Sequence, residues 1–112
     1  MRPDGLLVMT EPLIGGQRAQ VIAFAKAARL PTSYDNANMV REGGLVSYGP
    51  LYVEHYVLAA GYVDKILKGG NPAELPVEQP TRFELIINLK TAKALGLTMP
   101  LSLLQRADEV IQ

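Results

Sequence analysis

The sequence contains no cysteine and only one histidine, and these absences exclude several kinds of site. Without cysteine the chain can form neither disulfides nor thiolate zinc sites, and it has no thiol nucleophile. His55 has no second histidine, cysteine or carboxylate at the spacing of helical metal ligands. We therefore expect no metal site, and we interpret His55 as a solvent-facing residue.

The sequence has no excess of charge and no long apolar run. Eleven Lys and Arg balance eleven Asp and Glu, and no basic stretch is interleaved with aromatic residues, so nucleic acid is not an expected partner. No apolar run approaches the roughly 18 residues that would cross a membrane. The first residues, MRPDG, lack the basic and apolar regions of a secretory signal, so the chain as written is predicted to be cytoplasmic.

Catalytic motifs are also missing. The serines at positions 33, 47 and 102 have only His55 as a possible base, and none lies in a Gly-x-Ser-x-Gly elbow. No glycine motif that would cradle a phosphate occurs. The sequence therefore predicts a protein that is not an enzyme and that carries no cofactor.

What the chain does have is the composition of an ordinary globular domain. Of its 112 residues, 48% are hydrophobic and 20% are charged, and a chain of this length can bury a real core. We therefore expect one domain over residues 1–112.

Hydrophobic periodicity predicts an alternation of strands and helices. Strands are expected at 6–9, 31–34, 45–48 and 83–89, and helices at 17–29, 50–68, 91–95 and 102–111, with Ser102 as the N-cap of the last. Residues 35–39 are expected to form a polar loop or helical turn, and the proline-rich segment 71–80 an extended surface connection. The order β-α-β-β-α-β-α-α predicts an α/β fold with a parallel sheet. A buried parallel strand needs neighbours on both sides, so a chain that begins on one resembles a piece of a larger protein.

Three segments resemble the family of ABC-transporter substrate-binding proteins whose characterised members bind tryptophan or tyrosine. They are EGGLVSYGP at 42–50, YVDKILKG at 62–69 and the tail LPVEQPTRFELIINLKTAKALG at 75–96, which continues through Pro100, SLL at 102–104 and ADEVI at 107–111. The resemblance covers essentially the whole chain from Leu6 onward, and its tail is the most specific part.

The resemblance implies a type I periplasmic-binding-protein fold, in which two α/β lobes close on a small ligand and then dock on an ABC permease. The chain would be the C-terminal third of such a protein, a partial three-layer, parallel-sheet lobe. On this interpretation the N-terminal lobe and the signal peptide of the family would be absent from it. The full-length parent would be periplasmic.

Five residues form the predicted ligand site. Tyr34, Asp35 and Asn36 lie where one strand ends, and Ser47 and Tyr48 lie where the next strand passes into the long helix. In open α/β sheets these strand ends face the ligand crevice. A tyrosine can stack on an aromatic ligand, and the helix N-terminus after Gly49 can receive a carboxylate, so an aromatic amino acid would use both features.

Each of these residues also has a structural interpretation. Tyr34 and Tyr48 can pack on the core, Asp35 and Asn36 can form a turn, and neither Ser47 nor Glu42 needs a function. Tyr52 and Tyr56 lie four residues apart on one helix, which favours core packing over a stacking platform.

Three hypotheses for function remain open. The parent is a solute-binding subunit of an ABC importer for an aromatic or related amino acid, and this chain forms one wall of its cleft. Alternatively, the chain binds nothing small and self-associates as a homo-oligomer through the apolar surface that the missing lobe leaves uncovered. In the third, the same fold serves as a ligand-sensing regulatory domain.

Overall fold

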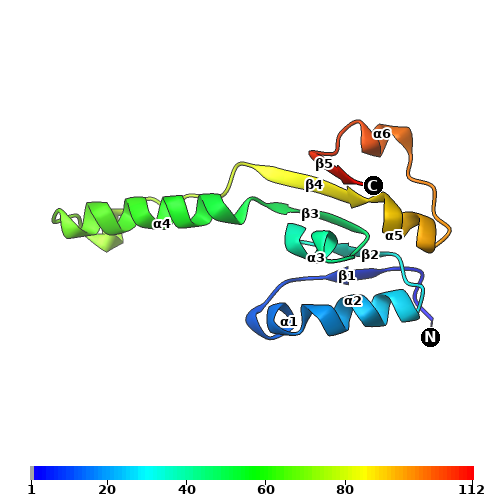
Figure 1. Cartoon of the computed structure of the whole chain (residues 1–112). Coiled ribbons are helices and arrows are strands. Elements are labelled where there is room, and N and C mark those ends of the chain that lie inside the picture. The colour runs from blue at the N-terminus through cyan, green and yellow to red at the C-terminus, as the bar shows by residue number, and fades with distance from the viewer. Residues whose placement is uncertain (1) are drawn as a thin grey trace. The chain divides into compact units, whose positions relative to one another are not determined.

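A computed structural model describes residues 2–112, and it divides into two compact units (Figure 1). The first unit comprises the chain up to Gly49 and again from Glu84 onward, and the second is Pro50–Phe83. Each unit is described by itself.

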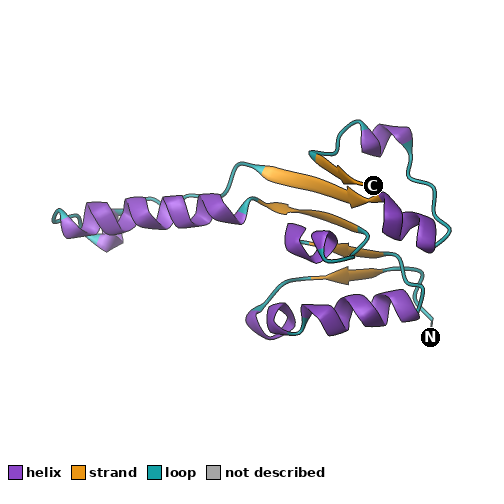
Figure 2. Ribbon diagram, viewed as in Figure 1, coloured by secondary structure: helices purple, strands orange, loops and turns teal. Residues whose placement is uncertain are grey.

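The first unit is a five-stranded sheet with short helices (Figure 2). Its elements are β1 (Leu6–Val8), α1 (Pro12–Gly16), α2 (Arg18–Ala27), β2 (Thr32–Tyr34), α3 (Ala37–Arg41), β3 (Val46–Pro50), β4 (Phe83–Asn88), α5 (Leu89–Ala94), α6 (Leu101–Leu104) and β5 (Glu109–Ile111). The strands lie in the order β1-β2-β3-β4-β5. The predicted α/β class is confirmed.

Most neighbouring strands are parallel. β1 pairs in parallel with β2, β2 with β3, and β4 with β5. Around β3 and β4, the Asn88 N–H donates to the Leu45 carbonyl at 2.9 Å and the Leu51 N–H donates to the Arg82 carbonyl at 3.1 Å. The end of β4 therefore lies beside the start of β3, so this pair runs antiparallel inside a mostly parallel sheet.

One face of β1, β2 and β3 is covered, and the other is open. The buried strand residues are Val8, Thr32, Tyr34 and Ser47, and the helix residues in the core beside them are Ile22, Met39 and Val40. On the opposite face Leu7 is 66% exposed and Tyr48 is 62% exposed. Among the described residues, helices thus cover a single face of these strands, as expected of a partial three-layer lobe.

The C-terminal end differs from the sequence prediction. The last helix ends at Leu104, and Pro100, not Ser102, occupies its N-cap position. Residues 109–111 form β5, which pairs with β4. Asp108 starts this strand, because its N–H donates to the Leu85 carbonyl and its carboxylate accepts the Leu85 N–H, each at 2.8 Å. Strand pairing has overridden the helical pattern of these residues.

The second unit is a helix with a returning segment. It contains α4 (Tyr52–Leu67), which confirms the predicted long helix, and the 3₁₀ turn η1 (Pro72–Glu74). The Tyr62 hydroxyl donates to the Pro76 carbonyl and accepts the Glu78 N–H at 2.9 Å. Glu54 and Arg82 form an ion pair at 3.3 Å. These contacts hold the returning segment along α4.

No residue of α4 is fully buried. Tyr56 is 75% exposed and Tyr52 is 37% exposed, so the prediction that both pack in a core is wrong for the residues described. His55 is half-buried against the edge of the Tyr52 ring, with its Nε2 enclosed, and is therefore not the solvent-facing residue predicted. None of the helices within residues 2–112 combines the length and the apolar character that crossing a membrane requires.

Replacing Tyr62 by Phe should loosen the returning segment while leaving α4 intact. The substitution removes both hydrogen bonds of the hydroxyl, each worth about 0.5–1.5 kcal/mol, and keeps the ring. Hydrogen exchange followed by mass spectrometry should show faster exchange over residues 76–80. Unchanged exchange in that segment would mean that the hydroxyl does not hold it.

Replacing Asn88 by Ala should destabilise the first unit strongly. The buried Asn88 amide accepts the Thr91 N–H at 3.1 Å and donates to the Val40 carbonyl at 3.2 Å. We expect a loss of about 2 kcal/mol or more in the free energy of unfolding, measured in urea. Asn71→Ala is the matched control, because Asn71 caps only the exposed turn η1 and should cost about 0.5 kcal/mol. Equal losses for the two variants would contradict this account.

Candidate functional site

The candidate site lies at the edge of the sheet where β1, β2 and β3 end. Because these three strands are parallel, the residues that follow them reach the same edge. Thr10 follows β1 and Asp35 follows β2, while Gly49 lies near the end of β3. This edge therefore collects residues that are far apart in the sequence.

Asp35 is fixed by Thr10. The Thr10 N–H lies 3.0 Å from both carboxylate oxygens of Asp35, and the Thr10 hydroxyl donates to Oδ1. Hydrogen bonds to a carboxylate are stronger than neutral ones. The pair therefore connects the ends of β1 and β2 and sets the direction of a negative charge at this edge.

Asn36 begins the next helix. Its Oδ1 accepts the Asn38 N–H at 2.9 Å, and its backbone is extended, as expected of an N-cap. The sequence predicted a turn or a ligand contact here, and the structure shows that this side chain starts α3.

Gly49 allows β3 to approach Asp35 closely. A Cβ at this position would lie 1.9 Å from the Asp35 carbonyl oxygen, a distance at which two atoms cannot coexist. Only glycine fits here. From the sequence, Gly49 is only the residue before the helix N-terminus, and its contact with Asp35 depends on the pairing of β2 with β3.

A small cavity of about 140 Å³ opens beside these residues. It is lined by Thr10, Gly15, Arg18, Asn36, Asn38 and Met39. Arg18 is paired with Glu42 at 2.7 Å. The guanidinium group in the lining of the cavity is therefore already neutralised, and the other lining groups are uncharged. Thr10 and Arg18 could not be chosen from the sequence, because only the pairing of the strands brings them beside Asp35 and Asn36. Asn38 is two residues from Asn36, and its position in the cavity follows from the first turn of α3.

The structure separates the five predicted site residues. Asp35 and Asn36 lie together at the strand-end edge. Tyr34 is 1% exposed in the core, where burial raises the pKa of its phenol, and the Ser47 hydroxyl is buried without a hydrogen-bond partner. Tyr48 lies on the open face of the sheet. A ligand contact by any of the five stays a prediction.

The raised pKa of Tyr34 has a consequence at high pH. The folded state keeps the phenolic proton at pH values where the unfolded chain loses it. The burial of the neutral phenol therefore stabilises the fold in full below the unfolded pKa of about 10. This stabilisation is lost as the pH rises through the folded pKa.

No group of three or more histidine, aspartate or glutamate side chains within residues 2–112 could hold a metal ion. The edge offers the oriented carboxylate of Asp35, the Arg18–Glu42 ion pair and neutral polar groups. Such a surface can bind an organic molecule by hydrogen bonds and charge.

A mostly parallel sheet with polar residues at its strand ends defines an α/β ligand-binding lobe. The family model for ABC transporter substrate binding protein matches residues 2–111. The chain belongs to this family. A search of curated proteins finds no match.

Solved structures agree with this assignment. A conserved domain protein from Vibrio cholerae is 29% identical with a TM-score of 0.90, and the match covers 96% of this chain and 36% of that one. An ABC domain from Streptococcus pneumonia, in complex with L-Trp, is 30% identical with a TM-score of 0.88, over 96% of this chain and 37% of that one. The chain thus spans little more than a third of the length of these proteins.

A more distant structure shows the fold alone. The ligand-free, open form of a substrate-binding protein with adhesive properties from Clostridium difficile is 23% identical with a TM-score of 0.60, over 96% of this chain and 36% of that one.

Gly49→Ala should disrupt the site and lower stability. The added methyl group meets the Asp35 backbone, so β2 and β3 must separate, and we expect a loss of about 1–3 kcal/mol or more in the free energy of unfolding. Gly61→Ala in α4 is the control, because nothing lies within 4 Å of its Cβ and alanine favours a helix by about 0.5–1 kcal/mol. If urea unfolding shows that G49A is as stable as the original chain, the close contact with Asp35 does not exist.

Proposed function

We propose that this chain forms part of the solute-binding component of an ABC importer and that the ligand is an aromatic or related amino acid. The observation that carries the proposal is the 30% identity, over 96% of the chain, to the Streptococcus ABC domain in complex with L-Trp. In this function the chain binds and releases its ligand without a chemical step. The complete protein delivers it to an ABC permease and is periplasmic.

The strand-end edge has chemistry that suits an amino acid. Asp35 presents a carboxylate held from one side by Thr10, and it can pair with an α-ammonium group on the other. Tyr48 lies one residue before Gly49, which contacts the Asp35 backbone, and offers an exposed aromatic ring for stacking. Charge and aromatic surface are therefore present near the ends of two neighbouring strands, β2 and β3.

The chain supplies only one wall of such a site. Pockets that bind small molecules enclose most of the ligand surface, whereas the cavity at this edge holds about 140 Å³. The solved relatives are almost three times as long as the matching segment. Further polypeptide would complete the cleft and also cover the open face that carries Leu7 and Tyr48.

Self-association is the second candidate function, and the same open face favours it. A parallel sheet with exposed Leu7 and Tyr48 can bury them against a second copy. Analytical ultracentrifugation of the 112-residue chain at tens of micromolar should then show a dimer or larger species. A monodisperse monomer would count against this candidate.

A chimera tests the main proposal directly. Residues 2–111 replace the matching segment of the Streptococcus protein, and L-Trp binding is measured by calorimetry. We expect micromolar or tighter binding. A folded chimera that binds no L-Trp or other aromatic amino acid would refute the proposal.

Asp35→Asn in the chimera tests the role of the carboxylate. The amide keeps the shape of the side chain and one acceptor for Thr10, but it loses the charge that pairs with the ammonium group. Binding of L-Trp should weaken about tenfold or more, whereas binding of indole-3-propionate, which lacks the ammonium group, should not weaken. Glu74→Gln on η1 is the control and should change neither affinity. An equal loss for both ligands would show that Asp35 has only a structural role.

A further inference from the structure

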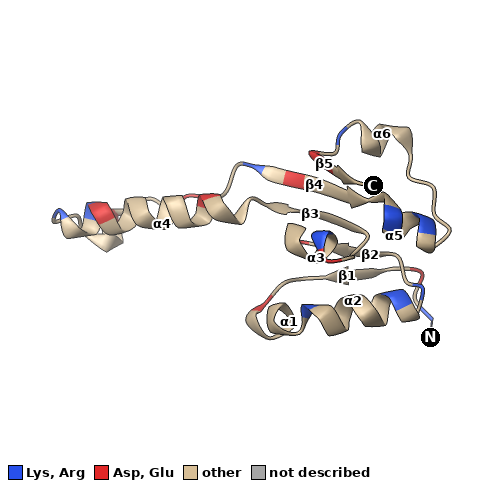
Figure 3. Ribbon diagram, viewed as in Figure 1, with Lys and Arg blue, Asp and Glu red and all other residues tan. Residues whose placement is uncertain are grey.

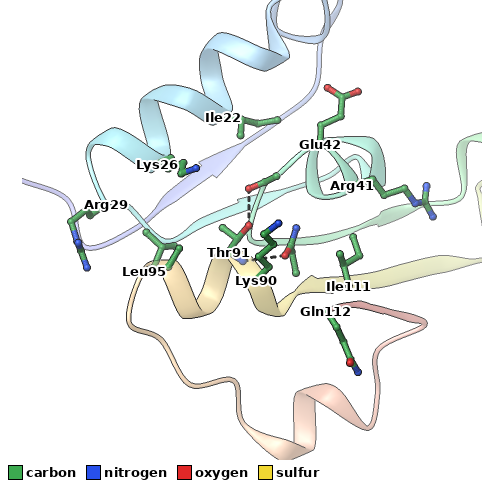
Figure 4. A pocket seen from close by; sticks show the side chains of 13 residues that line it. Ile22, Lys26, Arg29, Arg41, Glu42, Lys90, Thr91, Leu95, Ile111 and Gln112 are labelled. Atoms are coloured by element: carbon green, nitrogen blue, oxygen red, sulfur yellow. Dashed lines mark hydrogen bonds between the residues drawn. The ribbon is translucent and has the colours of Figure 1, made fainter.

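A second and larger cavity lies away from the strand-end edge. It has a volume of about 660 Å³ and is bordered by α2, α3 and α5 (Figure 4). Gly43, just before β3, and Asn88, at the end of β4, both line it, so it lies at the edge where β3 begins. This groove is therefore at the opposite edge of the sheet from Asp35.

The base of the groove is fixed by hydrogen bonds. The Thr91 hydroxyl donates to the Gly43 carbonyl at 2.9 Å, and the Asn88 amide donates to the Val40 carbonyl at 3.2 Å. These bonds attach α5 and its N-cap to α3 and to the segment between α3 and β3. The carbonyls of Gly43 and Val40 at the base are thus occupied by these bonds.

The walls combine apolar side chains with cations. Ile22, Leu95 and Ile111 supply the apolar surface. Lys26 from α2 and Lys90 from α5 extend into the space between the two helices, as Figure 4 shows. A molecule in the groove would contact both hydrocarbon and ammonium groups.

These cations are not neutralised within the described part of the chain. Lys26, Arg29 and Lys90 line the groove, and no ion pair involves their side chains. The other charged residues of the lining are paired, Arg41 with Glu109 at 2.7 Å and Glu42 with Arg18 at 2.7 Å. Although the whole chain is neutral, the groove carries a local positive charge, and Figure 3 shows basic residues on both α2 and α5.

Helix electrostatics explains only part of this arrangement. Lys26 and Arg29 lie at the C-terminal end of α2, where the helix dipole favours cations. Lys90 lies in the first turn of α5, where the dipole disfavours a cation. An anion bound in the groove would offset this unfavourable position.

We propose that the groove binds a small organic anion, a carboxylate with an apolar body. Its volume falls within the range of about 300–1,000 Å³ typical of small-molecule sites. The ammonium groups of Lys26 and Lys90 hold the carboxylate, and Ile22, Leu95 and Ile111 contact the apolar body. The groove is separate from the amino-acid site and does not depend on it.

Titration with hexanoate, followed by NMR of the labelled 112-residue chain, tests the proposal. Hexanoate should shift the signals of Ile22, Thr91 and Leu95. Acetate, which has the charge without the apolar body, and 1-hexanol, which has the body without the charge, should each bind about tenfold more weakly or worse. Equal binding of 1-hexanol or of acetate would overturn the proposal, as would shifts confined to Leu7 and Tyr48 on the open sheet face.

The double variant Lys26→Gln, Lys90→Gln should lower hexanoate affinity at least about tenfold while the spectrum keeps its dispersion. Lys93→Gln is the matched control, because Lys93 lies on α5 outside the groove and should change the affinity less than about twofold. Unchanged affinity in the double variant would overturn the proposal.

If the isolated chain gives no dispersed spectrum, the chimera takes its place. Hexanoate should then bind without weakening L-Trp, whereas direct competition between the two would also overturn the proposal.

Discussion

The architecture depends on a constraint of parallel strands, which need a hydrophobic layer on each face. β1, β2 and β3 meet this need on one side, where the α2 residue Ile22 and the α3 residues Met39 and Val40 cover Val8 and Tyr34. On the other side Leu7 and Tyr48 remain exposed. One face of these strands is therefore packed like the interior of an α/β lobe, and the other face exposes apolar side chains that a complete lobe would cover. The chain's family membership and its coverage of about a third of the solved relatives are consistent with this state.

The antiparallel pair β3–β4 organises the rest of the first unit. Because β4 runs back beside β3, its end lies near Leu45, and Asn88 can reach the Val40 carbonyl while it starts α5. Thr91 then reaches the Gly43 carbonyl. One reversal of direction thus places α5 next to α3 and creates the groove at the edge opposite Asp35. The two candidate sites lie at opposite edges because β4 and the first three strands end at opposite edges.

Sequence patterns predicted the elements whose signals are local. The helices at 18–27 and 52–67 follow the helical spacing of apolar residues, and the strand before Leu89 follows its β-branched residues. Residues 109–111 fit a helical pattern locally, and their pairing with the strand that contains Ile86 and Asn88 cannot be seen within a short stretch of sequence. The exposure of Tyr56 was missed for a related reason, since periodicity shows which side chains share a helix face but not whether anything covers that face.

The candidate site was predicted only in part, and the reason is again non-local. That polar residues gather at strand ends is a property of the fold class, so Asp35 and Asn36 could be chosen from the sequence. The partner of Asp35 is Thr10, 25 residues away, and the register of β1 against β2 brings the two together. The alternation of side chains along a strand places Tyr34 and Ser47 inward and Tyr48 outward, and the short segments 31–34 and 45–48 do not show from their residue types alone which face is the inner one.

The glycines of β3 bear on how this chain tolerates mutation. At Gly49 an added Cβ meets the Asp35 backbone, and at Gly44, just before the strand, it would lie 2.5 Å from the Tyr34 ring and 2.8 Å from the Met39 carbonyl oxygen. Every amino-acid replacement at these two codons introduces a Cβ, so none is conservative. At Gly15, by contrast, an added Cβ would be 3.8 Å from the nearest atom, the methyl carbon of Thr10. The two close approaches, one just before β3 and one within it, therefore fix how near the strand lies to Tyr34, Asp35 and Met39.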